Sequence, residues 1–321
     1  MTNIRGSVLR FAFSVLAALA LVMGSTQALG AEKRKARWVQ SIYMDAKGNG
    51  LKYPEGVACR DSYFVVADTG NSRILRYSYE GDSVTPEAEF ALPKSYPIKI
   101  ELNSKGDIYF LDGRERRIAM LSAAGEEMGF LKPTSLPSSK DIVPKGFAIG
   151  TDDDIYILDI FSARVLVLDS EGKYRRHVVF PDEYGFFSDV AVDAQGNIYI
   201  LDGPEAAVYT AARGADRFTP LTDSMKDYMN FPTNLFVGDR GVIYLVDQYG
   251  SGLALVGPDG AFLGRMLELG WGERGVYYPS QICVSPNQNL FIADRNNSRV
   301  QRFRLNKGGS AERKDEAAPS E

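Results

Sequence analysis

The sequence predicts an all-β chain folded as a six-bladed β-propeller of four-stranded blades. Six times a short apolar run ends in an aspartate, and the steps between these aspartates are 43 to 47 residues, the length of one blade. These repeat aspartates are Asp68, Asp112, Asp159, Asp202, Asp247 and Asp294. A proline lies fourteen or fifteen residues before five of them, and Phe187 takes its place in the fourth unit. We therefore expect one closed ring over residues 32–305.

The N-terminus has the pattern of a secretory signal. Arg5 and Arg10 precede an apolar run over residues 11–23, and small residues follow as far as Ala31. The apolar run is shorter than the roughly 20 residues that span a bilayer. We expect residues 1–31 to be removed during export to the periplasm or the extracellular space, although retention as an uncleaved anchor stays open.

Each unit is expected to contain four strands joined by turns rich in glycine, asparagine and aspartate. In the first unit the strands are predicted at residues 57–60, 63–67, 73–79 and 87–92. The segment over residues 36–43 looks like a strand without a unit, whereas the sixth unit stops after its third strand, residues 300–305. The N-terminal strand should therefore complete the last blade and close the ring. Residues 306–321 are polar and charged, so we predict a disordered tail.

The two cysteines, Cys59 and Cys283, fall in the innermost strands of the first and last units. A closed ring makes these strands neighbours, but the registers of the two residues differ by one. Because successive side chains in a strand point to opposite faces, we expect two buried free thiols rather than a disulfide.

The repeats resemble the NHL family. The pattern is clearest in Pro54-Glu-Gly-Val-Ala58 followed by Val66-Ala-Asp-Thr-Gly-Asn-Ser-Arg-Ile74, and again in Ile292-Ala-Asp-Arg-Asn-Asn-Ser-Arg-Val300. The resemblance covers about residues 36–305 and implies a six-bladed propeller. It implies little about function, because propellers have many unrelated activities.

Arginines gather in the loops that follow the repeat aspartates, on one rim of the expected ring. The predicted binding rim comprises Arg73, Arg114, Arg116, Arg117, Arg164, Arg295 and Arg299, together with the aromatic residues Trp271 and Tyr184. We expect a basic arc through blades 6, 1, 2 and 3 that binds an acidic protein segment or a polyanionic glycan. In the alternative, the arginines pair with the repeat aspartates and the aromatic side chains fill the grooves between blades.

A second candidate site is the mouth of the central channel, where the inner strands begin. Glu55, Asp189, Asn234 and Gln281 could bring oxygen ligands together near the axis, as a hard cation such as Ca²⁺ requires. Six-bladed lactonases and gluconolactonases have a comparable oxygen-ligand site, so a metal-dependent hydrolase is the alternative function. Two arguments oppose a cation. Lys99 and Lys145 lie in the same ring, and the mouth could be filled by water alone.

Other activities are disfavoured by composition. The resemblance extends to amidating lyases that use histidine-bound zinc, but His177 is the only histidine, and one histidine with two separated cysteines cannot form the usual zinc site. No nucleophile elbow, phosphate-binding glycine loop or Ser-His-Asp set is present. Removing two arginines with the signal leaves 35 basic against 41 acidic residues, a net charge of −6, which disfavours general nucleic-acid binding. We therefore expect a non-catalytic binding protein without a cofactor.

Overall fold

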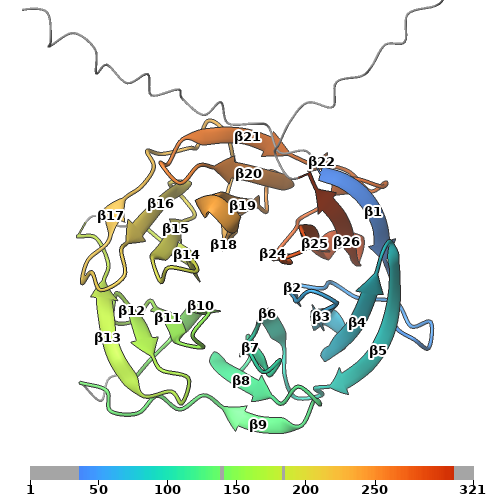
Figure 1. The fold of residues 1–321 in the computed structure, drawn as a ribbon, viewed down its shortest axis with the longest axis horizontal. Coiled ribbons are helices and arrows are strands. Elements are labelled where there is room, and N and C mark those ends of the chain that lie inside the picture. Colours follow the sequence, from blue (N-terminus) through green and yellow to red (C-terminus); the bar gives the residue numbers. More distant parts are fainter. Residues whose placement is uncertain (1–35, 138–140, 183–184, 307–321) are drawn as a thin grey trace, which may run out of the picture. The chain divides into compact units, whose positions relative to one another are not determined.

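The computed structural model describes residues 36–137, 141–182 and 185–306, and over these ranges the chain forms six four-stranded antiparallel sheets arranged as the blades of a propeller (Figure 1). The predicted signal and all but the first residue of the predicted tail lie outside these ranges. No helix in the described part of the chain has the length and apolarity needed to span a bilayer.

The first three blades follow the predicted order of strands, from the channel outward. Blade 1 contains β2 (Gly56–Cys59), β3 (Tyr63–Asp68), β4 (Arg73–Glu80) and β5 (Ser83–Ala91). Blade 2 contains β6 (Pro97–Leu102), β7 (Ile108–Asp112), β8 (Arg117–Leu121) and β9 (Glu127–Phe130). Blade 3 contains β10 (Pro144–Ile149), β11 (Ile155–Asp159), β12 (Arg164–Leu168) and β13 (Tyr174–Val179).

The remaining blades complete the ring. Blade 4 contains β14 (Phe187–Val192), β15 (Ile198–Asp202), β16 (Ala207–Ala211) and β17 (Thr219–Pro220). Blade 5 contains β18 (Pro232–Val237), β19 (Ile243–Asp247), β20 (Gly252–Val256) and β21 (Phe262–Met266). Blade 6 contains β24 (Ile282–Val284), β25 (Asn289–Asp294), β26 (Arg299–Leu305) and β1 (Ala36–Ile42). A short parallel pair, β22 (Glu268–Leu269) and β23 (Gly275–Val276), and three short 3₁₀ turns, η1 (Thr69–Asn71), η2 (Asp239–Gly241) and η3 (Arg295–Asn297), lie in connections.

The N-terminal strand closes the ring, which confirms the prediction from the two chain ends. β1 pairs antiparallel with β26, from Ala36 opposite Leu305 to Ile42 opposite Val300 (Figure 1). The pairing covers the edge that β26 would otherwise expose and joins the first residues of the described chain to the last. Closure therefore rests on backbone hydrogen bonds between segments about 260 residues apart.

The core lies between neighbouring blades, where the opposed sheet faces pack together. Between blades 6 and 1, Phe64 and Phe291 stack with their ring centroids 4.4 Å apart, and both side chains are fully buried. The inner strands alternate their side chains between the two faces, so each blade contributes to two such layers. The same arrangement holds around the ring and makes each blade depend on its neighbours.

The prediction of two free thiols was wrong, because Cys59 and Cys283 form a disulfide with a Cα–Cα distance of 6.0 Å. Cys59 pairs with Phe64 and Cys283 pairs with Phe291 across their hairpins, so their registers do differ by one residue. However, neighbouring blades meet through opposite faces of their sheets. A difference of one residue therefore turns the two side chains toward each other rather than apart, and the disulfide joins the first and last blades.

Candidate functional site at the upper rim

The upper rim is the side of the ring that carries the loops following the repeat aspartates. All six repeat aspartates are fully buried. Each accepts hydrogen bonds from backbone N–H groups of the loop that enters its blade: Lys52 N lies 2.7 Å from Asp68 Oδ1, and Tyr277 N lies 2.7 Å from Asp294 Oδ1. The repeat aspartates therefore hold the rim loops in place.

Three of the predicted rim arginines are buried beside these aspartates. Arg73, Arg164 and Arg299 place Nε at 2.7, 3.4 and 2.7 Å from Oδ2 of the aspartate of their own blade. For Arg73 and Arg299 burial acts to lower the pKa, but the hydrogen bonds to acidic and phenolic partners outweigh it and raise the pKa above its ordinary value. These side chains stabilise the fold, so the expected basic arc is not continuous at the surface.

Blade 2 carries the exposed part of the predicted arc. Arg114, Arg116 and Arg117 are all exposed, and Arg117 lies over the ring of Phe130, with 3.7 Å between the guanidinium carbon and the ring centroid. Arg116 takes a φ of 53°, in the left-handed region. Lys145, in the neighbouring blade, lies 5.2 Å from the ring centroid of Phe186 and adds another cation to this side of the rim.

A chain of aromatic contacts crosses the rim from blade 5 to blade 1. Phe231 meets Tyr249 edge to face at 5.3 Å, and Tyr249 meets Tyr278 in the same way at 5.0 Å. The Arg295 guanidinium then lies 5.8 Å from the ring centroid of Tyr278 and 5.4 Å from that of Tyr53. Burial, followed by the contact with Tyr249, raises the pKa of Tyr278 to about 12. We call these five residues the aromatic chain.

Two tyrosines of the aromatic chain have unusual backbones. Tyr53 and Tyr278 precede Pro54 and Pro279 and have φ values of 46° and 58°. Bulky residues rarely adopt the left-handed region, and such conformations are concentrated at functional sites. Tyr53 and Tyr249 were not predicted as site residues, although the Tyr-Pro pairs at the start of blades 1 and 6 are a sequence signal that could have indicated Tyr53.

The aromatic residues considered for the rim in the sequence differ in their exposure. Trp271 is 71% exposed and lies beside Tyr277, with a ring distance of 5.8 Å. Tyr184 lies outside the described residues. Phe187 is buried and fills space between blades, as favoured by its place next to the inner strand.

The four candidate metal ligands converge on the axis, but other protein groups occupy their polar atoms. Asp189 accepts a hydrogen bond from Lys99 Nζ, and its second oxygen lies 2.6 Å from Asn234 Nδ2. Gln281 Oε1 accepts from Ile100 N at 3.1 Å. Lys99, Asp189, Asn234 and Gln281 are all buried. They form a layer between a small upper cavity of about 130 Å³ and the lower channel.

Glu55, the fourth candidate ligand, pairs with Arg295 at 3.0 Å. For Arg295 burial acts to lower the pKa, but the hydrogen bond to Glu55 and the charge of Glu55, together with Tyr96, outweigh it and raise the pKa. No group of three or more His, Cys, Asp or Glu side chains suited to a metal is found among the described residues. An ammonium group against Asp189 and the use of the amide oxygens by backbone donors do not fit a divalent cation at this position.

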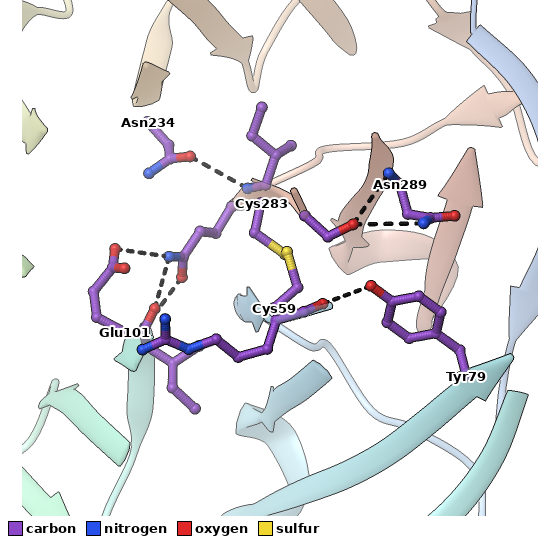
Figure 2. Close-up of a disulfide and its surroundings, with 11 residues drawn as sticks. Cys59, Tyr79, Glu101, Asn234, Cys283 and Asn289 are labelled. Atoms are coloured by element: carbon purple, nitrogen blue, oxygen red, sulfur yellow. Dashed lines mark hydrogen bonds between the residues drawn. A yellow bond between two sulfur atoms is a disulfide. The ribbon is translucent and has the colours of Figure 1, made fainter. Parts of the chain in front are cut away.

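Below this layer, the channel contains a cavity of about 320 Å³. Its lining includes the carboxyl group of Glu101, which was not predicted as a site residue from the sequence. Glu101 lies near the Cys59–Cys283 disulfide (Figure 2), and its Oε1 is 3.4 Å from Gln281 Nε2 and 4.0 Å from Lys99 Nζ. Enclosure by the channel wall raises the pKa of Glu101 to about 7, with Lys99 opposing the shift and Asp189 adding to it. The position of Glu101 in inner strand β6 did not predict its raised pKa, because the shift depends on residues of neighbouring blades.

His177 lies in β13, the outermost strand of blade 3, whereas the channel is lined by the innermost strands. Its Nδ1 lies 2.7 Å from the hydroxyl of Tyr174, and burial followed by the charge of Arg164 lowers its pKa. The only histidine of the chain thus belongs to the side of blade 3.

Comparisons with known proteins support the fold. The family model described as NHL repeat matches residues 276–303. No curated protein matches the sequence significantly. Among solved structures, a catalytically inactive virginiamycin B lyase from Staphylococcus aureus with quinupristin is 14% identical, with a TM-score of 0.61 over 85% of this chain and 100% of that chain.

Two further structures are similar to the same extent. A putative gluconolactonase is 18% identical, with a TM-score of 0.62 over 85% of this chain and 92% of the other. A gluconolactonase from Xanthomonas campestris is 15% identical, with a TM-score of 0.60 over 85% and 97% of the two chains. At identities this low, the likeness shows a common fold and gives no information about activity. The chain is therefore a six-bladed β-propeller in which residues 276–303 match an NHL repeat.

Proposed function

We propose that this protein is an exported, non-catalytic binding module that holds an acidic segment of a partner protein on its upper rim. The observation that carries the proposal is the aromatic chain from Phe231 to Tyr53, built partly on backbones in the left-handed region. Aromatic and arginine side chains at such positions supply most of the energy of protein interfaces. Trp271, which is 71% exposed, extends the same surface.

The charge of the rim favours an acidic partner. Arg114 and Arg116 are exposed cations for which no carboxylate of the described residues lies within 4.0 Å, and Lys145 stands beside Phe186. Guanidinium groups bind carboxylates through two parallel hydrogen bonds, so they suit aspartate- and glutamate-rich segments. Screening by salt should weaken such a complex.

Export is supported by two features of different kinds. The N-terminal pattern is that of a secretory signal. In addition, the disulfide between the first and last blades is of a type that persists in oxidising compartments such as the periplasm.

Catalysis of the kind named for the similar structures is less well supported. The similar lyase is an inactive variant in which alanine replaces a histidine, whereas the only histidine here lies in outer strand β13. A lactonase-type site would need the axial oxygens, and in this chain Lys99 and backbone N–H groups engage those of Asp189, Asn234 and Gln281.

Site-specific photocrosslinking in the producing cells tests the proposal. A benzophenone amino acid at Trp271 or Arg114 should give the same protein adduct, and an excess of an acidic peptide should suppress it. The same probe at Met128, which is 52% exposed in outer strand β9, is the control. Equal adducts from Met128, or an adduct at Trp271 that survives Arg114→Glu and 0.5 M salt unchanged, would contradict binding by this rim.

A further inference from the structure

One of the six repeat aspartates has a buried oxygen without a hydrogen-bond partner. Asp112 Oδ2 in blade 2 is enclosed, and no donor within the described ranges reaches it. The corresponding Oδ2 atoms of the other five repeat aspartates each accept at least one hydrogen bond. Their donors are Arg73 for Asp68, Arg164 for Asp159, Gly185 N for Asp202, Arg265 for Asp247 and Arg299 for Asp294.

Two local differences explain the missing partner. In blades 1 and 6 an asparagine three residues after the aspartate donates to Oδ2, as Asn71 does at 2.8 Å, but blade 2 has Glu115 at that place. The arginine five residues on, Arg117, points elsewhere. Its guanidinium lies over the Phe130 ring and 3.7 Å from Glu115, and half of the side chain is exposed.

The space beside Asp112 is a pocket of about 330 Å³ between blade 2 and the connection that leads into it from blade 1. Its apolar lining comes from this connection and from blade 2, and its charged lining includes two exposed carboxylates. The apolar residues are Leu92, Phe110, Ala119, Met120, Leu121 and Phe130, and the acidic residues besides Asp112 are Glu115 and Glu127. Lys94 and Arg117 are its cationic residues.

We propose that this pocket binds a small cation that carries a guanidinium group on an apolar stem. The guanidinium would donate N–H bonds to Asp112 Oδ2, the position that the blade's own arginine occupies in blades 1, 3 and 6. Its stem would pack against Leu92 and Phe130. A buried carboxylate oxygen without a donor is costly, so a ligand that supplies the donor gains more than it would at an exposed carboxylate.

The structure provides an isosteric variant for the test. Asp112 Oδ1 accepts from Tyr96 N at 3.1 Å and from Arg114 N at 2.9 Å, and these bonds hold the loop. In Asp112→Asn the amide oxygen can keep both bonds while the amide nitrogen replaces Oδ2. The fold should therefore persist, whereas the atom facing the pocket changes from an acceptor to a donor.

Calorimetric titration with agmatine, a four-carbon chain with a guanidinium at one end and an ammonium at the other, tests the site in the disulfide-bonded protein. We expect saturable binding to the wild type, weakened roughly ten- to hundredfold in Asp112→Asn, as loss of a hydrogen bond to a charged group implies. Asp159→Asn, the same change in blade 3, is the matched control and should leave agmatine affinity unchanged. An arginine-containing peptide as a second titrant separates a free small cation from a side chain presented by a protein.

Three results would overturn the proposal. The first is no binding by the wild type, and the second is equal binding by the wild type and Asp112→Asn. The third is binding by Arg117→Met alone, which would mean that Arg117 turns inward in solution and fills the site itself. This inference does not depend on the proposed function, because it concerns a cation in a groove and not an acidic segment on the rim.

Discussion

The disulfide between the first and last blades should supply a large part of the stability of the ring. Cys59 and Cys283 are separated by 224 residues in sequence, so the bond restricts most of the unfolded chain. The chain-entropy relation for a loop of this length gives about 5 kcal/mol. Typical domains are stable by about 5–15 kcal/mol in all, so loss of the disulfide should be plainly measurable.

The perturbation is Cys59→Ala combined with Cys283→Ala. The folded ring should survive, because β1 still pairs with β26 and the Phe64–Phe291 stack remains. The double variant should lose about 5 kcal/mol in the free energy of unfolding, almost all through a less restricted unfolded state.

Urea unfolding of the chain without its signal, followed by tryptophan fluorescence and circular dichroism, measures this difference. The slope of the free energy against urea should rise in the double variant, because its unfolded state exposes more surface. A reducing agent should shift the wild type to the midpoint of the double variant and leave the double variant unchanged. A difference below about 1 kcal/mol, with superimposable wild-type curves in the presence and absence of reductant, would refute the reasoning.

Two further predictions concern charged groups. Because the folded-state pKa of Glu101 is raised from 4.5 to about 7, the folded state holds a proton that the unfolded state has lost, and stability should fall as pH rises from about 4.5 through 7. Glu101→Gln should abolish that fall. In urea titrations its free energy of unfolding should match that of the wild type near pH 4 and exceed it by about 2–3 kcal/mol at pH 8. Equal pH profiles of the two proteins would contradict the raised pKa. Arg299→Met breaks a buried ion pair with Asp294 and should cost about 3–5 kcal/mol, whereas Arg117→Met removes only a half-exposed ion pair with Glu115 and should cost less than about 1 kcal/mol. Equal losses in the two variants, measured by the same titration, would show that burial of the pair does not decide its contribution.

The repeated pattern was sufficient for the fold because it is local. The spacing of the repeat aspartates, the turn residues between strands and the unmatched strand over residues 36–43 are each visible in a short stretch of sequence. They predicted six blades and the closure by β1, which pairing with β26 confirms. The alternative interpretation of the rim arginines was equally local, because Arg73 and Arg299 lie five residues from the carboxylates they contact.

The features that failed or were missed depend on contacts between blades. The faces of Cys59 and Cys283 could be assigned from the register, but whether those faces meet depends on how two sheets oppose each other in a ring. Similarly, Arg117 has the same place in its repeat as Arg299, yet its side chain lies on Phe130 and leaves Asp112 Oδ2 without a donor. The sequence by itself determined the number of blades, their strands and their closure, because these follow from periodic patterning and turn chemistry. Only the tertiary structure decided which side chains meet across neighbouring sheets, because packing in a closed ring brings together residues that no spacing along the chain relates.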